Sequence, residues 1–243
     1  MITIERLEIA NIPVLSVVKA SERTSALPTV FYYHGFNGEK ESSLTLAYKM
    51  AEKGLRVILP DAPLHGERAK STSPIEHGVV FWEIVTGAIQ EIDKIYNKVQ
   101  AEGLILEDRV GFAGTSMGGM ITYAALTTYD WIKAAGVLMG TPYLSQRAKR
   151  TMEQAGELDR QCLEKVEALD LTKNLERLNE RPLFIWHGEK DQIVPVEDSR
   201  RFYQELQPEY NPENLVFIEE KERIHQISKL SIRKTAEWFA SKL

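Results

Sequence analysis

Six short apolar runs, separated by longer stretches with helical spacing, constrain the fold of this chain more than any other feature. The runs are rich in β-branched and aromatic residues and lie at 30–33, 57–59, 110–113, 135–139, 183–186 and 215–218. Strands that are buried on both faces of a parallel sheet have this composition. Strand and helix in alternation predict an α/β fold, in which a mostly parallel sheet is covered by helices on both faces.

Two earlier runs, at 2–9 and 14–18, predict a leading antiparallel pair and bring the expected sheet to eight strands. The predicted helices cover 42–53, 76–100, 117–128, 196–206 and 228–243. A length of 243 residues suits one α/β domain, so we expect residues 1–243 to form a single domain.

The segment from about 142 to 179 contains no strand signal, and its apolar residues have helical spacing with a break at Gly156. It is either a long crossover between two strands or a small helical cap over a site at the strand ends. Long insertions in such sheets often lie on the ligand side, which favours the cap.

Composition excludes several classes of protein. The chain has 30 Lys and Arg against 35 Asp and Glu, a formal net charge of −5, and no basic stripe, so nucleic acid is not an expected partner. No apolar run approaches the roughly 18 residues of a membrane span, and the N-terminus lacks the apolar core of a signal peptide. The single cysteine, Cys162, excludes an intrachain disulfide. We expect a cytoplasmic monomer or homodimer with no membrane partner.

The residues Gly114-Thr-Ser-Met-Gly-Gly119 carry the strongest chemical signal. They follow a predicted strand and open a predicted helix, a context that makes G-x-S-x-G specific. A sharp turn there exposes the Ser116 hydroxyl beside the amides of a helix N-terminus, which favour negative charge. The nucleotide-binding glycine motifs are absent. The pattern therefore predicts that Ser116 is a nucleophile.

A serine nucleophile needs a base, and the base needs an orienting group. Of the five histidines, His225 lies between the last strand and the last helix, at the same edge of the sheet as Ser116, and is the predicted base. Asp191 follows a buried strand and is the predicted acid, with Asp61 and Asp198 as alternatives. The chain order serine, acid, histidine is the one found in hydrolases with this motif. The remaining histidines are His34, His65, His77 and His187.

Two backbone amides are candidates for an oxyanion hole. The N–H of Met117, directly after the nucleophile, is the first, and the N–H of Phe36 in the glycine-containing loop 34–38 is the second. That loop can also be read as an ordinary glycine turn. Trp82 and Tyr143 are candidate substrate-binding residues, although core packing is the better explanation for either one taken singly. No second carboxylate or histidine shares a helical spacing with Asp61 and His65, so a metal is not expected, and a serine nucleophile with a base and an acid requires no cofactor.

Four local patterns together resemble the α/β-hydrolase superfamily: His34-Gly-Phe36, Asp61 with His65-Gly66, Gly114-x-Ser116-x-Gly118, and Gly188-x-x-Asp191-x-x-Val194-Pro195. The chain is most similar to small intracellular esterases related to the dienelactone hydrolase, cinnamoyl esterase and prolyl oligopeptidase branches. This resemblance implies a Ser116–His225–Asp191 triad, with the amides of Phe36 and Met117 as oxyanion hole. It also implies a structural role for Asp61, His65 and Arg68. Relatives commonly have a glycine before the catalytic histidine, where this chain has Ile224.

The expected function is hydrolysis of carboxylic esters, with short-chain acyl or aryl groups, through an acyl-enzyme on Ser116. A small-molecule ester is the expected partner. A peptidase, an acyl-aminoacyl hydrolase or a thioesterase with the same triad is the alternative, because one fold hosts all of these activities. A non-catalytic binding protein on this fold is an alternative from a different class.

Overall fold

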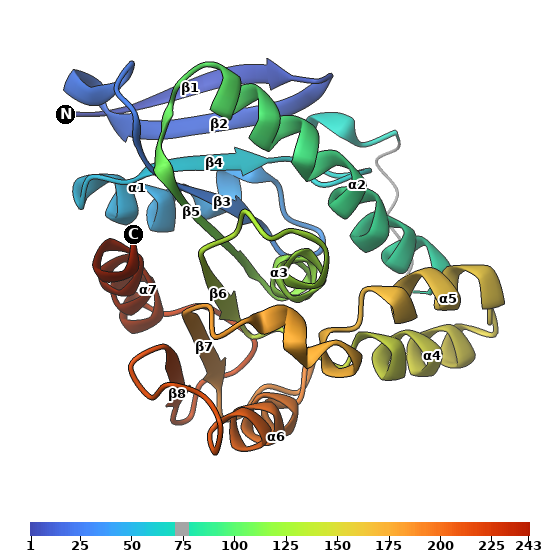
Figure 1. The fold of residues 1–243 in the computed structure, drawn as a ribbon. Coiled ribbons are helices and arrows are strands. Elements are labelled where there is room, and N and C mark those ends of the chain that lie inside the picture. Colours follow the sequence, from blue (N-terminus) through green and yellow to red (C-terminus); the bar gives the residue numbers. More distant parts are fainter. Residues whose placement is uncertain (71–77) are drawn as a thin grey trace.

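The structure is a computed structural model that describes residues 1–70 and 78–243. In these residues, eight strands form one sheet in the order β1-β2-β4-β3-β5-β6-β7-β8 (Figure 1). The strands are β1 Ile2–Ile9, β2 Ile12–Lys19, β3 Leu27–Tyr33, β4 Arg56–Pro60, β5 Ile105–Thr115, β6 Ala134–Leu138, β7 Leu183–Gly188 and β8 Leu215–Glu220. β2 pairs antiparallel with both β1 and β4, and the other neighbours are parallel. The prediction of an eight-stranded, mostly parallel sheet is confirmed.

Helices cover both faces of this sheet. They are α1 Leu44–Glu52, α2 Val79–Ala101, α3 Met117–Thr128, α4 Leu144–Ala155, α5 Arg160–Ala168, α6 Val196–Leu206 and α7 Lys229–Lys242. Short 3₁₀ turns lie at Ala20–Glu22, Lys40–Ser43, Gly66–Arg68, Leu171–Lys173 and Leu175–Leu178. The predicted bounds of α3 and α6 agree with the structure, whereas the predicted start of α2, with His77, lies outside the described residues.

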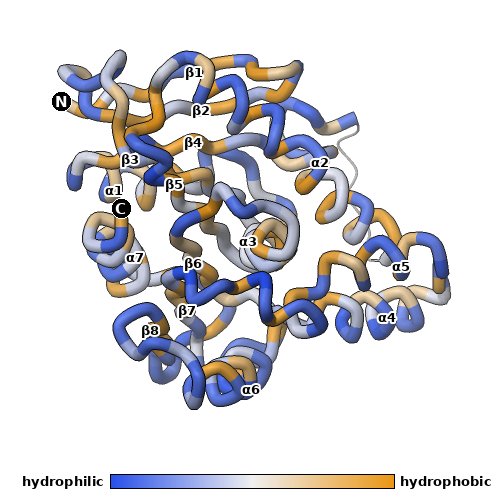
Figure 2. Tube along the Cα trace, viewed as in Figure 1, coloured by the Kyte–Doolittle hydropathy of each residue, from blue (hydrophilic) through white to orange (hydrophobic). Residues whose placement is uncertain are grey.

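The sheet separates two hydrophobic cores. One core lies between the sheet and α1 with α7, and the other lies between the sheet and α2, α3 and α6. The central strands are largely hydrophobic, whereas α4 and α6 alternate hydrophilic and hydrophobic residues (Figure 2). This difference follows from position, since the central strands are buried on both faces and these helices on only one.

The segment between β6 and β7 is largely helical, and its helices α4 and α5 lie beside the N-terminal end of α2 (Figure 1). α4 ends at Gly156, whose φ of +70° is the left-handed conformation common after a helix. The Asp159 side chain accepts from the N–H of Cys162 and so caps the start of α5. Leu158 lies before this cap and is exposed. No helix in 1–70 or 78–243 is long and apolar enough to cross a membrane.

Phe239 fixes α7 to the sheet. Its ring lies so close to Gly111 of β5 and Gly136 of β6 that a Cβ added at either glycine would come within 2.6 and 2.8 Å of it, respectively. The side chain is fully buried. The absence of side chains at these two strand positions therefore makes the space that the ring fills.

We expect Phe239→Ala to lower the free energy of unfolding by about 3–5 kcal/mol, because it leaves a cavity that two glycines cannot fill. Urea denaturation followed by far-UV circular dichroism measures this change. Arg233→Ala, an exposed position on the same helix, should change the same quantity by less than about 0.5 kcal/mol. Equal losses in the two variants would contradict the role given to the ring.

Candidate active site

Ser116 lies in a strained turn between β5 and α3. Its φ is +55° and its ψ is −111°, a conformation that L-residues rarely adopt. A Cβ at Gly114 would lie 2.3 Å from the Gly118 backbone, and one at Gly118 would lie 2.1 Å from the Tyr33 carbonyl oxygen. Both glycines are therefore required if α3 is to pack this closely on β3 and β5. The turn leaves the Ser116 hydroxyl at the end of the sheet.

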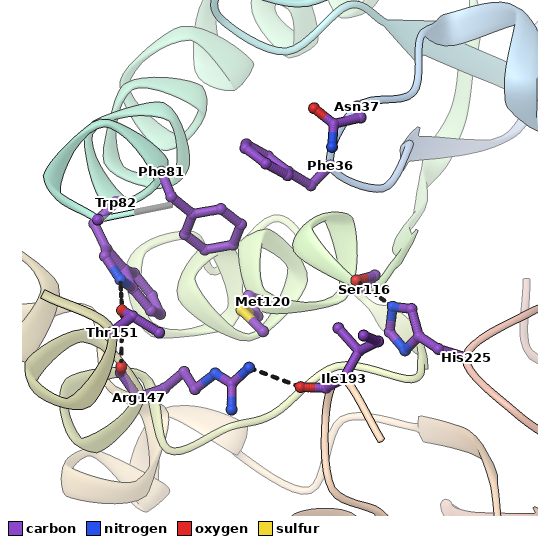
Figure 3. A pocket seen from close by; sticks show the side chains of 11 residues that line it. Phe36, Asn37, Phe81, Trp82, Ser116, Met120, Arg147, Thr151, Ile193 and His225 are labelled. Atoms are coloured by element: carbon purple, nitrogen blue, oxygen red, sulfur yellow. Dashed lines mark hydrogen bonds between the residues drawn. The ribbon is translucent and has the colours of Figure 1, made fainter. Parts of the chain in front are cut away.

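The structure brings the predicted nucleophile, base and acid into one hydrogen-bonded chain (Figure 3 shows the first two). The Ser116 hydroxyl donates to Nε2 of His225 over 2.8 Å, and Nδ1–H of His225 donates to Oδ2 of Asp191 over 2.6 Å. Asp191 follows β7, and His225 lies between β8 and α7. The ends of neighbouring parallel strands meet at one edge of the sheet, so residues 109 positions apart in the chain come into contact.

Asp191 is held as a carboxylate. Its Oδ1 accepts from the N–H groups of Ile193 and Val194, each over 2.9 Å. Burial acts to raise its pKa, but hydrogen bonds from His187, His225 and Val194 outweigh burial and keep the pKa well below its ordinary value. The side chain is therefore ionised at neutral pH and is able to stabilise a positive charge on His225.

His187 supports Asp191 and was not assigned a role from the sequence. Its Nε2–H donates to the Val194 carbonyl oxygen over 2.9 Å and lies 3.2 Å from Oδ2 of Asp191. Its Nδ1 accepts from the Ser199 hydroxyl over 2.8 Å, and the ring is fully buried. The only sequence signal for this role is its position, as the last residue but one of β7.

Gly188 explains how the loop before His225 closes without a glycine at position 224. A Cβ at Gly188 would lie 2.5 Å from the Arg223 carbonyl oxygen and 2.8 Å from that of Ile224. The N–H of Lys190 donates to the same Arg223 oxygen over 2.8 Å. The close approach is thus provided by β7, and the Ile224 side chain is exposed to solvent.

Two other histidines hold the loop that contains Phe36. Nε2 of His34 accepts from the N–H of Ala62 over 3.1 Å, and Nε2 of His65 accepts from the N–H of Asn37 over 3.2 Å. Burial lowers the pKa of His34 to about 4, although its Nδ1–H donates to the Gly35 carbonyl oxygen over 2.8 Å. Both imidazoles tie loop 34–38 to the segment after β4.

Asp61, the alternative acid, forms its hydrogen bonds with groups other than His225. It is fully buried and accepts from the backbone N–H of Lys40 over 2.9 Å and from Nζ of Lys40 over 2.8 Å. The N–H of Glu67 donates to it over 3.1 Å, and Arg68 donates to its carbonyl oxygen over 3.1 Å. Asp198, in the first turn of α6, is not a hydrogen-bond partner of His225.

The two predicted amide donors belong to segments next to Ser116. Met117 is the first residue of α3, so its N–H has no acceptor within the helix. Gly35 is close enough to the nucleophile that an added Cβ would lie 3.6 Å from Cβ of Ser116. Phe36 follows directly, and its ring packs on Phe81 at a centroid distance of 5.1 Å.

A cavity of about 190 Å³ opens beside Ser116 and His225 (Figure 3). Its other lining residues are Phe36, Asn37, Gly78, Phe81, Trp82, Met120, Arg147, Thr151 and Ile193. Trp82, a candidate substrate-binding residue, is among them, and its Nε1–H is donated to the Thr151 hydroxyl over 2.8 Å. Tyr143 does not line it. Its hydroxyl donates to Glu205 over 3.0 Å and its ring packs under Arg201, because it lies before α4 on the side facing α6.

Neither a metal centre nor a reactive thiol is evident in the described residues. Within 1–70 and 78–243, no group of three or more His, Cys, Asp or Glu side chains could hold a metal ion. Cys162 is buried on α5, and burial raises the pKa of its thiol to about 11, which leaves it protonated at neutral pH.

The sheet topology together with the strand–turn–helix around Ser116 defines an α/β-hydrolase fold. Residues 86–243 match the prolyl oligopeptidase family, and the chain belongs to that family. It is 41% identical to "Putative esterase YitV" of Bacillus subtilis (strain 168), with both proteins covered completely. It is 33% identical to "Esterase YjfP" of Escherichia coli (strain K12), over 85% of each.

The fold also resembles the crystal structure of TT1662 from Thermus thermophilus. That comparison gives a TM-score of 0.82 at 23% identity and covers 99% of this chain and 98% of the other. The likeness extends over the whole sheet and its helices, and at this identity it shows the fold alone.

The lowered pKa of His34 predicts a pH dependence of stability. An unfolded histidine has a pKa near 6.5, so between about 4 and 6.5 the unfolded chain binds more protons, and stability falls as pH falls through this window. We therefore compare the free energy of unfolding of wild type minus that of His34→Asn at two pH values. This difference should be smaller at pH 4 than at pH 7, by up to about 3 kcal/mol. Urea titrations of both proteins at several pH values measure this. A difference that stays constant with pH would contradict the assignment.

Proposed function

We propose that this protein is a serine hydrolase of carboxylic esters and that Ser116, His225 and Asp191 are its catalytic residues. The observation that carries the proposal is the hydrogen-bonded chain from the Ser116 hydroxyl through both nitrogens of His225 to a buried carboxylate. The names of the two relatives, both esterases, support the choice of an ester bond.

In the first half of the proposed reaction, His225 takes the proton of Ser116 as its Oγ attacks the ester carbonyl carbon. Asp191 orients the imidazole and stabilises the imidazolium that forms. The carbonyl oxygen becomes negative and is stabilised by the amides of Phe36 and Met117, where each donor is worth about 3 kcal/mol. His225 then protonates the leaving alcohol, and the acyl group remains on Ser116.

In the second half, a water molecule attacks the acyl-enzyme. His225 removes the proton from this water, and the same two amides stabilise the second oxyanion. Collapse of the intermediate breaks the bond to Oγ, which recovers its proton from His225, and the free acid leaves. Apart from the ester and this water, every reacting group in both halves comes from the chain itself.

The cavity favours small substrates. A volume of about 190 Å³ walled by Phe36, Phe81, Trp82 and Met120 fits a short acyl chain or a single aromatic ring. We also propose that the helical segment 142–179 is a cap, since Arg147 and Thr151 of α4 form one wall of this cavity.

A peptidase is the second candidate, because the family that the chain matches is named for an oligopeptidase. The triad and the two amides serve amide hydrolysis equally well. Turnover of an acyl-amino acid p-nitroanilide, compared with that of the matching p-nitrophenyl ester, separates the two activities.

We expect the wild type to hydrolyse p-nitrophenyl esters from acetate to butyrate and to lose activity toward laurate, because the cavity holds only short chains. Ser116→Ala should lower kcat by about 10⁴- to 10⁶-fold, as the loss of such nucleophiles does. Release of p-nitrophenol at 405 nm measures both. Near-native turnover in the variant would refute the mechanism.

Asp191→Asn should lower kcat by about 10⁴-fold with a much smaller change in KM, because the variant holds His225 in the wrong tautomer and leaves its positive charge unstabilised. Asp198→Asn is the matched control and should retain activity within about threefold of wild type. The same p-nitrophenyl assay compares them. A larger loss in Asp198→Asn than in Asp191→Asn would reassign the acid.

A further inference from the structure

One wall of the cavity carries a cation that the proposed ester chemistry does not use. Arg147 extends from α4 across the cavity, between Met120 and Ile193 (Figure 3). Its surroundings are largely apolar, with Phe81, Trp82, Met120 and Ile193 lining the same space. A guanidinium remains charged in such a place, so this wall presents a positive charge to the cavity.

The guanidinium of Arg147 has more N–H donors than its hydrogen bonds within the protein use. One of its terminal N–H groups donates to the Ile193 carbonyl oxygen over 2.7 Å. In the part of the chain that the structure describes, Arg147 forms no salt bridge with a carboxylate. By contrast, Arg68 is paired with Glu91 over 2.7 Å and Arg200 with Glu219. An arginine carries five N–H donors, so most of those on Arg147 are open to a ligand.

We propose that Arg147 binds a carboxylate carried by the ester substrate, so that the enzyme prefers anionic esters over neutral ones of the same size. This inference rests on the proposed function and deepens it. The ester carbonyl lies at Ser116, the body of the substrate packs among the aromatic rings, and its carboxylate accepts from the free N–H groups of Arg147. Charge-assisted hydrogen bonds of this kind are about twice as strong as neutral ones.

Burial around Arg147 supports this assignment. Burial lowers the pKa of its guanidinium, as does the nearby Arg150, while Asp198 and Asp191 act in the opposite direction. An anion bound at Arg147 therefore offsets a desolvation cost that the chain itself compensates only in part. The competing explanation is a purely structural one, in which Arg147 only ties α4 to the loop after Asp191.

Two matched ester pairs separate these explanations. In the first pair, 4-acetoxybenzoate carries a carboxylate on the alcohol side and 4-acetoxybenzamide is its neutral counterpart. In the second, p-nitrophenyl monoadipate carries it on the acyl side and p-nitrophenyl hexanoate is neutral. We expect kcat/KM of the wild type to favour the carboxylate member of at least one pair by about tenfold or more. No preference in either pair would overturn the proposal.

Arg147→Gln should remove this preference. We expect it to lower kcat/KM for the carboxylate ester by about 10- to 100-fold and to change that for the neutral ester by less than about threefold. Lys149→Gln removes the same charge from an exposed position two residues along α4 and should keep the wild-type ratio. Equal losses for both esters in Arg147→Gln would show a structural role and overturn the proposal.

Binding to an inactive variant tests Arg147 independently of turnover. In the Ser116→Ala background, calorimetry should show tighter binding of 4-acetoxybenzoate than of 4-acetoxybenzamide, and adding Arg147→Gln should abolish the difference. Equal affinities in the Ser116→Ala protein would overturn the inference about Arg147. Failure of the proposed function appears differently, as an absence of ester turnover in the wild type or as turnover unchanged by Ser116→Ala.

Discussion

The close contact between the backbone of α3 and that of β3 and β5 determines the rest of the site. Side chains at Gly114 or Gly118 would overlap backbone atoms, so the chain can make this turn only with glycine at both positions. This turn forces Ser116 into a strained backbone conformation with a φ of +55°. The packing of α3 between the sheet and the outer helices holds the residue in that conformation. Because α3 starts at this contact, its free amides and the Ser116 hydroxyl face the same space.

Two buried carboxylates at strand ends show how partners decide the role of a residue. Asp61 follows β4 and is neutralised by a buried lysine, Lys40, so its charge is used in holding a loop together. Asp191 follows β7, and its partners are two imidazoles and two amides. Its negative charge is thus left to act on His225, whose own charge changes during the proposed reaction. The two aspartates look alike in the sequence and differ only in what the fold places beside them.

The sequence predicts the sheet and the three linked residues well, because both depend on local signals. Strands buried on both faces appear as continuous apolar runs. The three residues each follow a predicted strand, in the order serine, acid, histidine, and the ends of parallel strands lie at one edge of the sheet. The wall of the cavity depends instead on how α4 is rotated against its neighbours. Leu144, Ala148 and Met152 are its buried stripe, and Arg147 and Thr151 flank that stripe on the side facing Ser116. Helical periodicity shows the stripe but not which flank faces the site, so Tyr143 was expected there and Arg147 was not.

The proposed catalytic residues and the far wall of the cavity therefore come from different parts of this fold. The hydrogen-bonded chain of Ser116, His225 and Asp191 is built from the ends of sheet strands, whose register is fixed by both cores. The far wall comes from α4, which contacts the rest of the site through side-chain hydrogen bonds, from Trp82 to Thr151 and from Arg147 to the Ile193 carbonyl. In the proposed function, the strand ends thus supply the reacting groups, and α4 supplies the wall that selects the substrate.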